Sequence, residues 1–434
     1  MEKEKIVDNI IDIYPEEVKK IVEKILNKFP NSSMSEIVKR IDILLEEQVV
    51  VFSGSFDPWT YGHEAVVRDY LRMNPNSKVK VVLWVNPNKK GTFTPKQRKI
   101  LIEKTLWDDL KDRVEVDIYS GLIADYVYEN WYSHIIKWVR NDVDFVYEKD
   151  IATLSKRFSW DVMTSFIPQI DSLKAGISSS SFKALFSFGW DVYSDASPVV
   201  REALRMKQSW QWIIGLTWWI ASWKTTFWKW LEELSEKTDI KIHYLNLDKI
   251  TNIIHTSDKE FCVRARNKIK EQFWDEVLLL DWTTNKKILW DIVFKDELKM
   301  QKLMDIMLEP LIHLLKKQIS KIDTPWIILV EWAIIFDRGL TYLFDENIIH
   351  IWVSPEKQRE RVEKRDWLTK KQIEHRLKSQ VSKQERIQWI KNNQDKYSDR
   401  FFLDIDGENY DLENIVSEIL NEYKKRREMF WNHE

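Results

Sequence analysis

The chain has 434 residues, a formal net charge of −2, 44% hydrophobic and 31% charged residues, which predicts a soluble protein of two or three domains. The near-neutral charge argues against nucleic acid as a partner, and no apolar run is long enough to span a bilayer, so we expect no membrane partner either. The first residues carry no signal-peptide core and Cys262 is the single cysteine, so we expect a cytoplasmic protein without disulfides.

Residues 1–47 are rich in Lys and Glu, and their apolar residues recur at spacings of three and four. This period predicts amphipathic helices. No pattern in the stretch indicates chemistry. The default interpretation is a helical extension used for docking or oligomerisation, so a homo-oligomer is possible.

Residues 48–208 are predicted to form a first α/β domain. The strand-like runs "QVVVFSGSF", "KVKVVLWV", "RVEVDIYS" and "HIIKWV" alternate with helix-like segments. Alternating strands and helices imply a parallel sheet with right-handed crossovers. We expect this domain to close with helices that run to about Lys207.

Residues 209–434 repeat the alternation, which predicts a second α/β domain. Its strand-like runs are "SWQWIIGLT", "IKIHYLNL", "WIILVEW" and "NIIHIWV", and charged helices follow over about 355–395. No low-complexity linker separates the two domains. We therefore expect an α/β fold with two parallel-sheet domains behind an N-terminal helical extension.

The first chemical segment is "GSFDPWTYGHEAV", 54–66, at the junction of a predicted strand and helix. Ligands of open parallel sheets bind beyond the carboxyl ends of the strands. Gly54 would let a ligand approach the backbone. Gly62 and His63 would open a helix whose free N–H groups favour phosphate. The alternative for His63 is helix capping or packing.

This segment resembles the T/HxGH nucleotidyltransferase superfamily, with Thr60, Gly62 and His63 in the signature places. The segments "NPNKKGTFT", "KWVRNDVDFVYE", "GISSSSFKAL" and "GWDVYSDASPVVREAL" are similar to bacterial phosphopantetheine adenylyltransferase. The resemblance covers about 48–207 and implies a Rossmann-like nucleotidyltransferase. It implies that the phosphate of 4′-phosphopantetheine attacks the α-phosphorus of ATP, giving dephospho-CoA and pyrophosphate.

The same resemblance implies roles for single residues. His63 would stabilise the transferring phosphoryl group, and Lys89 would meet the phosphopantetheine phosphate and assist the transition state. The residues expected to bind phosphopantetheine are Ser55, Lys89, Ile123 and Lys137. The residues expected to bind ATP are Ser55, Phe56, His63, Trp138, Arg140, Glu148, Ser178, Ser179 and Ser180. Lys137 stands where the family has an arginine, and lysine lacks the bidentate fork.

Glycine and tryptophan occur in abnormal numbers, with 9 glycines and 23 tryptophans in 434 residues. A glycine share of about 2% is far below the average of about 7%, which the two residue types reach together. Tryptophan also stands where turns favour glycine, as in "FSFGWDV" and "LLLDWTTN". Our hypothesis is that the gene uses UGA as a glycine codon and that the printed sequence shows it as tryptophan. The alternative is a truly tryptophan-rich protein.

The second chemical segment is "GLTWWIASWKTT", 215–226, which follows a predicted strand and precedes a predicted helix. With glycine at 218, 219 and 223, positions 218–225 match the phosphate-binding pattern G-x-x-x-x-G-K-[ST]. Lys224 would then bridge the β- and γ-phosphates of ATP, and Thr225 would hold Mg²⁺. The residues of this predicted loop are Trp218, Trp219, Ile220, Ala221, Ser222, Trp223, Lys224, Thr225 and Thr226. Literal indoles would fill the space reserved for phosphate.

The remainder, about 210–425, resembles dephospho-CoA kinase, a P-loop kinase. "HYLNLDKITNIIH" is similar to its Asp-Ala-Asp segment, with Asp248 on the catalytic aspartate and Asn246 in place of the first. "IWVSPEKQRERVEKRDWLTKKQIEHRLKSQ" is similar to its lid, with Arg361 and Arg365 on the lid arginines. The alternative for these arginines is a solvated helix face.

This second resemblance implies a kinase reaction on dephospho-CoA. Asp248 would orient or deprotonate the ribose 3′-hydroxyl. Lys224, Mg²⁺ and the lid arginines, Arg361 foremost, would stabilise the transferring γ-phosphoryl group.

The two implied reactions are consecutive, and their combination resembles bifunctional CoA synthase. ATP, 4′-phosphopantetheine and dephospho-CoA are therefore the expected partners, with Mg²⁺ as cofactor. Two alternatives stay open. The first is an active adenylyltransferase joined to an inactive kinase-like module, if the tryptophans are real. The second is a nucleotide-binding regulatory protein with both sites degenerate, against which intact Lys89, His63, Lys224 and Asp248 argue.

Overall fold

The computed structural model divides the chain into two compact units, Met1–Phe182 and Lys183–Glu434. The predicted extension, 1–47, lies outside the described residues except for Ser33 and Glu36. The described residues are 33, 36, 49–85, 90–106, 108–130, 132, 134–139, 142, 145–146, 148–150, 153, 162–168, 177–189, 192–218, 240–293, 296–324, 326–336, 338–366, 383–396 and 400–431.

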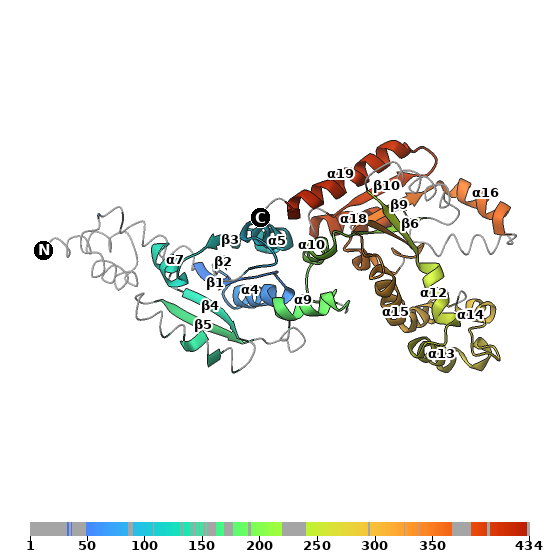
Figure 1. Ribbon diagram of the computed structural model, residues 1–434, viewed down its shortest axis with the longest axis horizontal. Helices are drawn as coiled ribbons and strands as arrows, with labels where there is room; N and C mark the ends of the chain where they lie inside the picture. Colours follow the sequence, from blue (N-terminus) through green and yellow to red (C-terminus); the bar gives the residue numbers. More distant parts are fainter. Residues whose placement is uncertain are drawn as a thin grey trace. The chain divides into compact units, whose positions relative to one another are not determined.

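The first unit is built on a parallel sheet that has five strands among the described residues, in the order β3-β2-β1-β4-β5 (Figure 1). The strands are β1 (Val49–Gly54), β2 (Lys78–Trp84), β3 (Val114–Tyr119), β4 (His134–Val139) and β5 (Met163–Pro168). The chain moves outward from β1 to β3 and then returns to β4 on the other side of β1. The carboxyl ends of β1 and β4 therefore flank a topological switch point, where open α/β sheets bind ligands.

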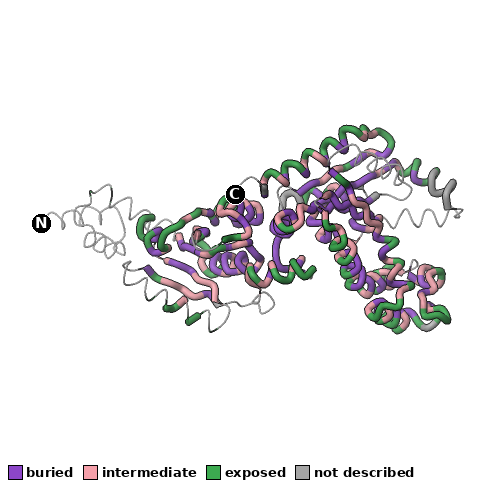
Figure 2. The backbone as a smooth tube through the Cα atoms, in the orientation of Figure 1, coloured by how far each residue is buried: buried purple, intermediate pink, exposed green. Residues whose placement is uncertain are grey.

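Helices connect these strands and cover the sheet. The helices of this part of the chain are α4 (Tyr61–Met73), α5 (Pro95–Thr105), α6 (Asp108–Lys111), α7 (Ile123–Glu129) and α9 (Ser179–Ser187), the last of which spans the division between the units. The central strand β1 is apolar on both faces, and Val50 and Val51 are both 0% exposed. Such a continuous apolar run is typical of a parallel strand that is covered on two sides, and Figure 2 shows β1 as buried.

The second unit carries its own parallel sheet, with the order β10-β9-β6-β8-β7 among the described strands (Figure 1). The strands are β6 (Trp212–Trp218), β7 (Ile242–Asn246), β8 (Ile327–Glu331), β9 (Ile348–Trp352) and β10 (Phe402–Asp406). The first strand, β6, is central, so its carboxyl end lies between those of β8 and β9. The α/β fold with two parallel sheets is therefore confirmed.

Helices surround the second sheet, and α12, α13, α14 and α15 pack on one another. A buried apolar cluster that includes Ile254, Ile269, Leu289 and Leu311 joins these four helices. The helices are α10 (Pro198–Ser209), α12 (Leu247–Thr256), α13 (Glu260–Phe273), α14 (Lys286–Val293), α15 (Glu297–Ile319), α16 (Pro355–Asp366), α18 (Lys383–Lys396) and α19 (Leu412–Trp431), with short 3-10 turns at Asp275–Val277 and Thr341–Phe344. In the part of the chain that is described, no helix is long and apolar enough to cross a bilayer.

The division between the units differs from the predicted junction at 208/209. Helix α10, which we expected at the end of the first domain, contacts α19 and β6 of the second unit. Its apolar face is fully buried, with Val200, Ala203 and Leu204 each 0% exposed. The functional extents 48–208 and 209–434 stay a prediction.

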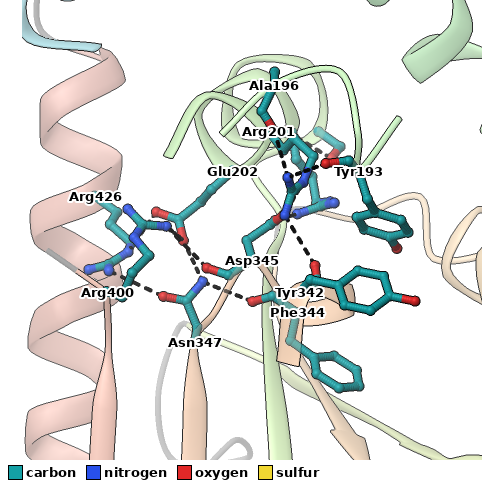
Figure 3. Close-up of polar contacts among 12 residues, drawn as sticks. Tyr193, Ala196, Arg201, Glu202, Tyr342, Phe344, Asp345, Asn347, Arg400 and Arg426 are labelled. Atoms are coloured by element: carbon teal, nitrogen blue, oxygen red, sulfur yellow. Dashed lines mark hydrogen bonds and ion pairs between the residues drawn. The ribbon is translucent and has the colours of Figure 1, made fainter. Parts of the chain in front are cut away.

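Buried charges attach α10 to the second unit. Glu202 of α10 accepts hydrogen bonds from Asn347 at 2.6 Å, Arg426 at 2.9 Å and Arg400 at 3.0 Å (Figure 3). We call these four residues the Glu202 network; none of them is more than 9% exposed. Burial opposes ionisation of Glu202, but the charges of Arg400 and Arg426 outweigh burial and lower its pKa. Asn347 precedes β9 and Arg400 precedes β10, so the network lies at the amino ends of the strands.

A second buried carboxylate, Asp345, reinforces this attachment. It is 0% exposed and accepts a hydrogen bond from Arg201 of α10 at 2.9 Å, and it also pairs with Arg205. Arg201 donates further bonds to the Ala196 carbonyl at 2.6 Å and the Tyr342 carbonyl at 3.1 Å (Figure 3). Each buried charge thus has an opposite charge beside it, which is the condition under which ions are tolerated in a core.

Candidate active sites

The turn after β1 carries an unusual backbone conformation. Phe56 has a φ of 44° and is 3% exposed. A bulky residue with positive φ is a genuine outlier, and such strain is concentrated at functional sites. A Cβ on Gly54 would lie 2.8 Å from the Phe56 ring, so glycine at 54 is what lets this ring fold back over the end of the strand.

His63 lies in the first turn of α4, and its tautomer follows from its partners. The Thr60 backbone N–H donates to His63 Nδ1 at 3.0 Å, and the Thr60 hydroxyl lies 2.8 Å from the same nitrogen. A backbone N–H can only donate, so Nδ1 carries a lone pair and the ring proton of the neutral form is on Nε2. The capping predicted as the alternative role for His63 is present, and it leaves Nε2–H as a donor.

The structure brings the serine segment 177–180 beside this turn. The Thr60 hydroxyl donates to the Ile177 carbonyl at 3.3 Å, and Ser179 Oγ donates to the Pro58 carbonyl at 2.8 Å. Ser178 directly precedes and caps α9, because its backbone N–H donates to Ser181 Oγ at 2.8 Å and its hydroxyl accepts from the Ser181 N–H at 3.0 Å. The amino ends of α4 and α9 therefore meet at the switch point, where their free N–H groups favour an anion.

A charged pair lies at the same edge, with Lys137 from β4 and Glu148 from the segment after it. Lys137 Nζ lies 3.2 Å from Glu148 Oε2, and both side chains are about one-fifth exposed, at 19% and 22%. We expected these residues to bind different ligands, phosphopantetheine and ATP respectively. The structure places them in contact with each other.

The Trp138 indole occupies the space next to His63. The two rings meet edge to face with centroids 5.3 Å apart, and the indole edge lies 2.8 Å from the position of a Cβ on Gly62. Phe56 and Trp59 approach His63 from other directions, at ring distances of 5.1 Å and 5.4 Å. Glycine at 138 would remove one of these three walls.

The other predicted residues of the first site are distributed along the same edge. Ser55 is exposed directly after β1, Ser180 is exposed in α9, and Ile123 begins α7 after β3. Lys89 and Arg140 lie outside the described residues. Sequence analysis missed Arg98, which donates to the backbone of this turn, and Asp57, which accepts from the backbone of the neighbouring loop.

The second unit places its expected site at the carboxyl end of β6. Thr217 is 0% exposed and donates to the Ala333 carbonyl at 3.1 Å, and Trp218 is the last residue of the strand. This fixes the point from which the predicted phosphate-binding loop departs. The loop residues after Trp218, from 219 to 226, lie outside the described part of the chain.

Asp248 lies exposed in the first turn of α12, directly after β7. Asn246 caps this helix, because its side chain accepts a hydrogen bond from the Lys249 N–H at 2.9 Å. Asn246 thus has a structural role at the position where the family has its first aspartate. The carboxylate of Asp248 is left at the edge of the sheet that carries the end of β6.

Glu331 is an acidic residue of this edge that the sequence did not single out. It ends β8, is 1% exposed, and pairs in register with Leu216 of β6 and Asn246 of β7. The available sequence signal was an acidic residue at the end of an apolar strand. That strand, β8, pairs with β6, from which the predicted phosphate-binding loop departs. Arg361 and Arg365 belong to α16, and the structure describes their backbone but not their side chains.

The acidic residues of this edge bear on a metal site. Within the described ranges, no group of three or more His, Cys, Asp or Glu side chains could hold a metal ion. Mg²⁺ in phosphoryl-transfer sites is usually held by one or two carboxylates together with substrate phosphates. Glu331 and Asp248 supply carboxylate oxygens at the edge where β6 ends, so the donor chemistry fits Mg²⁺ brought in with ATP.

Comparisons with known proteins separate the two halves of the chain. Residues 212–397 match the family model for dephospho-CoA kinase. The phosphopantetheine adenylyltransferase of Geobacter sulfurreducens is 36% identical over 161 residues, which span 37% of this chain and 94% of that protein. The corresponding enzyme of Geobacter metallireducens is 35% identical over 166 residues, which span 38% and 98%.

A solved dephospho-CoA kinase from Campylobacter jejuni aligns with 50% of this chain and 98% of its own, at 17% identity and a TM-score of 0.28, a similarity that adds no argument. The identity over nearly the full length of the Geobacter enzymes is decisive for the adenylyltransferase half. The chain belongs to the phosphopantetheine adenylyltransferase family and joins to it a region that matches the dephospho-CoA kinase family.

Proposed function

We propose that this chain catalyses the last two steps of coenzyme A biosynthesis. The first step transfers the adenylyl group of ATP to 4′-phosphopantetheine, giving dephospho-CoA and pyrophosphate. The second phosphorylates the ribose 3′-hydroxyl of dephospho-CoA with ATP. The observation that carries the proposal is that each half of the chain contains its own parallel sheet and matches one of the two enzyme families.

In the first step, the residues of the chain act by positioning and charge stabilisation. The amino ends of α4 and α9 and the Nε2–H of His63 converge at the switch point, so they can donate to phosphate oxygens as negative charge develops. The phosphopantetheine phosphate is the nucleophile and pyrophosphate leaves, so no covalent enzyme intermediate is required. The residues assigned to phosphopantetheine are Ser55, Lys89, Ile123 and Lys137. The residues assigned to ATP are Ser55, Phe56, position 138, Arg140, Glu148, Ser178, Ser179 and Ser180.

In the second step, Asp248 is assigned to the ribose 3′-hydroxyl, which it orients or deprotonates. Its exposure in the first turn of α12 supports access to a substrate. Lys224 is assigned to the β- and γ-phosphates and Arg361 and Arg365 to the lid. Mg²⁺, held through Thr225 and carboxylate oxygens of the same edge, would neutralise phosphate charge when bound.

The setting of both steps is proposed to be the cytoplasm, where ATP is supplied and Cys262 would stay reduced. Burial raises the pKa of the Cys262 thiol, which keeps it inert. A homo-oligomer stays a prediction that rests on residues 1–47.

We further propose that most tryptophans of the printed sequence are glycines in the natural protein. Six non-glycine residues of the described chain have positive φ, and three of them are tryptophans: Trp210, Trp274 and Trp282. Trp274, with φ 73° and ψ 172°, occupies a region that is essentially reserved for glycine. Trp210 follows α10 in the left-handed conformation typical of a glycine helix cap.

The surroundings of these tryptophans support the same proposal. Trp274 and Trp282 are 65% and 58% exposed, so little of their apolar surface is buried. Trp212 differs, because it lies in β6, is 0% exposed and packs on Phe401 with ring centroids 5.1 Å apart. The mass of the peptide spanning 215–226 from the natural source tests the proposal: glycine at 218, 219 and 223 is expected, and three tryptophans would refute it.

Each step is tested by supplying its own substrate to the full-length chain with glycine at 138, 218, 219 and 223. ATP and 4′-phosphopantetheine are expected to give dephospho-CoA, and ATP and dephospho-CoA are expected to give CoA. Failure of the second reaction alone would leave an adenylyltransferase with an inactive kinase-like module. Failure of both, with nucleotide still bound, would favour a regulatory protein.

A further inference from the structure

We propose that Arg98 is a positioning residue of the adenylyl-transfer site, which sets the orientation of the Ser55–Phe56 peptide. The inference rests on the proposed function of the first unit, since it assigns a task within that reaction. Arg98 lies in the first turns of α5, after the Thr94 cap, and is 7% exposed. Its Nη1 donates to the Ser55 carbonyl at 2.6 Å, across 43 residues of sequence.

The hydrogen bond fixes more than one atom. A peptide group is planar and trans, so its carbonyl and its N–H point in opposite directions. Because Arg98 holds the Ser55 carbonyl toward α5, the Phe56 N–H points away from α5. Among the described residues, this N–H has no hydrogen-bond partner. A buried backbone donor without a partner is costly, so a fixed free N–H at this turn is suited to an anionic ligand.

The strained φ of Phe56 requires such a restraint. At a φ of 44° the residue would relax toward the ordinary negative range unless its neighbours held it. The ring is packed against Phe52 and Trp59, at centroid distances of 5.1 Å for each. Packing holds the side chain, and Arg98 holds the peptide on its amino side. The two together define one direction for the Phe56 N–H.

Asp57 ties the same turn to the neighbouring loop. Its carboxylate accepts hydrogen bonds from the Thr92 N–H at 2.7 Å and the Phe93 N–H at 3.0 Å. These residues lie three and four positions beyond Lys89, which is assigned to phosphopantetheine. Burial lowers the pKa of Arg98, and the charge of Asp57 opposes this effect. Arg98 and Asp57 therefore connect the turn after β1, which is assigned to ATP, to the segment that follows Lys89, which is assigned to phosphopantetheine.

The first unit offers a matched control in Arg113. Within the described part of the chain, this arginine also donates only to backbone carbonyls, those of Ser77 at 2.9 Å and Asn74 at 3.0 Å among them. It directly precedes β3, so it lies at the amino ends of the strands, away from the proposed site. Loss of Arg113 should lower stability without altering the geometry of the reacting groups. Loss of Arg98 should do both.

The experiment compares Arg98→Met, Arg98→Lys and Arg113→Met in the full-length chain that forms dephospho-CoA. We expect Arg98→Met to lower kcat of adenylyl transfer by about 100-fold, the loss that a displacement of about 1 Å can cause, with the KM for ATP changed less. Arg98→Lys should recover part of kcat, because it keeps a charged donor. Arg113→Met should lower the melting temperature and leave kcat within about threefold.

Two results would overturn the inference: an Arg98→Met enzyme with near-normal kcat, or one whose whole loss of activity is a loss of folded protein, as for Arg113→Met. If Arg98→Met does not fold, Arg98→Lys decides through the same split between kcat and KM. CoA formation from supplied dephospho-CoA measures the integrity of the second unit in each variant. A parent chain that forms no dephospho-CoA would instead refute the proposed function.

Discussion

The two units end their first strands in different ways. After β1, glycine stands at 54 and 62, and a Cβ at either position would meet a neighbouring ring at 2.8 Å. After β6, the printed sequence places tryptophan at 218, 219 and 223, where the phosphate-binding pattern requires glycine at two positions. The turn after β1 therefore keeps the glycines that leave its backbone N–H groups accessible to a ligand. The printed sequence after β6 has the lysine and the threonine of the pattern but not its glycines.

This difference teaches that the two activities depend on the printed tryptophans to different extents. In the first unit, the indoles of Trp59 and Trp138 lie beside His63, while the turn keeps glycine at 54 and 62. In the second, tryptophan stands at three positions of the predicted loop itself.

Glycine at 218, 219 and 223 should create the kinase activity. Backbone N–H groups can wrap phosphate only if no side chains stand in the way, and losing even one such donor costs about 100- to 1,000-fold. We expect the triple substitution Trp218→Gly, Trp219→Gly and Trp223→Gly to raise CoA formation from dephospho-CoA by at least about 1,000-fold. Trp212→Phe, in the same strand, is the control and should give no increase. Equal rates of CoA formation with and without the glycines would show that the second activity does not depend on the printed tryptophans.

Removing the charge of Glu202 should destabilise the second unit and leave the stability of the first unchanged. Glu202→Gln leaves Arg400 and Arg426 buried without their carboxylate, which costs about 3–5 kcal/mol. We expect the second unit to unfold at lower denaturant while the first keeps its transition. Exposed Glu413→Gln is the matched control and should shift neither. A single shared shift would show that the network does not belong to the second unit alone.

The pH dependence of the same carboxylate has a definite sign. Its folded-state pKa lies below the unfolded value near 4.5, so the native state binds fewer protons. The stabilisation is therefore present above that pH and is lost as the pH falls toward the folded pKa. We expect Glu202→Gln to lose less stability at pH 3 than at pH 7, measured by urea unfolding. An equal loss at both pH values would contradict the assignment.

Reciprocal substitutions should separate the two reactions. His63→Ala removes the Nε2–H donor, and we expect adenylyl transfer to fall by about 100- to 1,000-fold while CoA formation from dephospho-CoA continues. Asp248→Asn should give the reverse pattern in the glycine-containing chain. Product analysis by mass spectrometry follows both steps in one sample. Loss of both reactions in either variant would refute independent sites.

The smallest effect concerns the turn that directly follows α13. Trp274→Gly should raise the free energy of unfolding by about 1–2 kcal/mol, because it relieves a backbone conformation that costs about 1–3 kcal/mol. Part of the gain is offset by the lost contact of Lys299 with the indole, 5.3 Å from the ring centroid. Trp212→Gly, which empties a packed position, should instead destabilise by several kcal/mol. Chemical unfolding measures the change in the free energy of unfolding for each variant. Destabilisation by Trp274→Gly as well as by Trp212→Gly would argue against glycine at 274.

Much of the fold could be predicted because central parallel strands are continuous apolar runs. The eight strands named from the sequence are all present, including "VVVFSG" and "IILVE". Strands β5 and β10 were not predicted. Their sequences, "MTSFIP" and "FLDID", mix polar and apolar residues and lack a continuous apolar run. The attachment of α10 to the second unit was also missed, since pairing between Glu202 and Arg400 spans 198 residues.

The candidate site was predictable where local pattern carried the chemistry. Thr60, Gly62 and His63 stand together in sequence, and the structure joins them to the serine segment through Ile177 and Pro58. Arg98 was missed because its partner is a backbone carbonyl, which no sequence pattern marks. The contact between Lys137 and Glu148 was missed because it depends on how the segment after β4 folds back on that strand.

The most direct test of two successive reactions in one chain uses ATP labelled separately at its α- and γ-phosphates. With 4′-phosphopantetheine and the glycine-containing chain, the α-label should enter dephospho-CoA first. In this first step the γ-label leaves in pyrophosphate, and among the coenzyme products it should appear only later, in CoA, as dephospho-CoA is consumed. If dephospho-CoA accumulates with the α-label and no CoA carrying the γ-label is ever formed, the proposed second reaction is wrong.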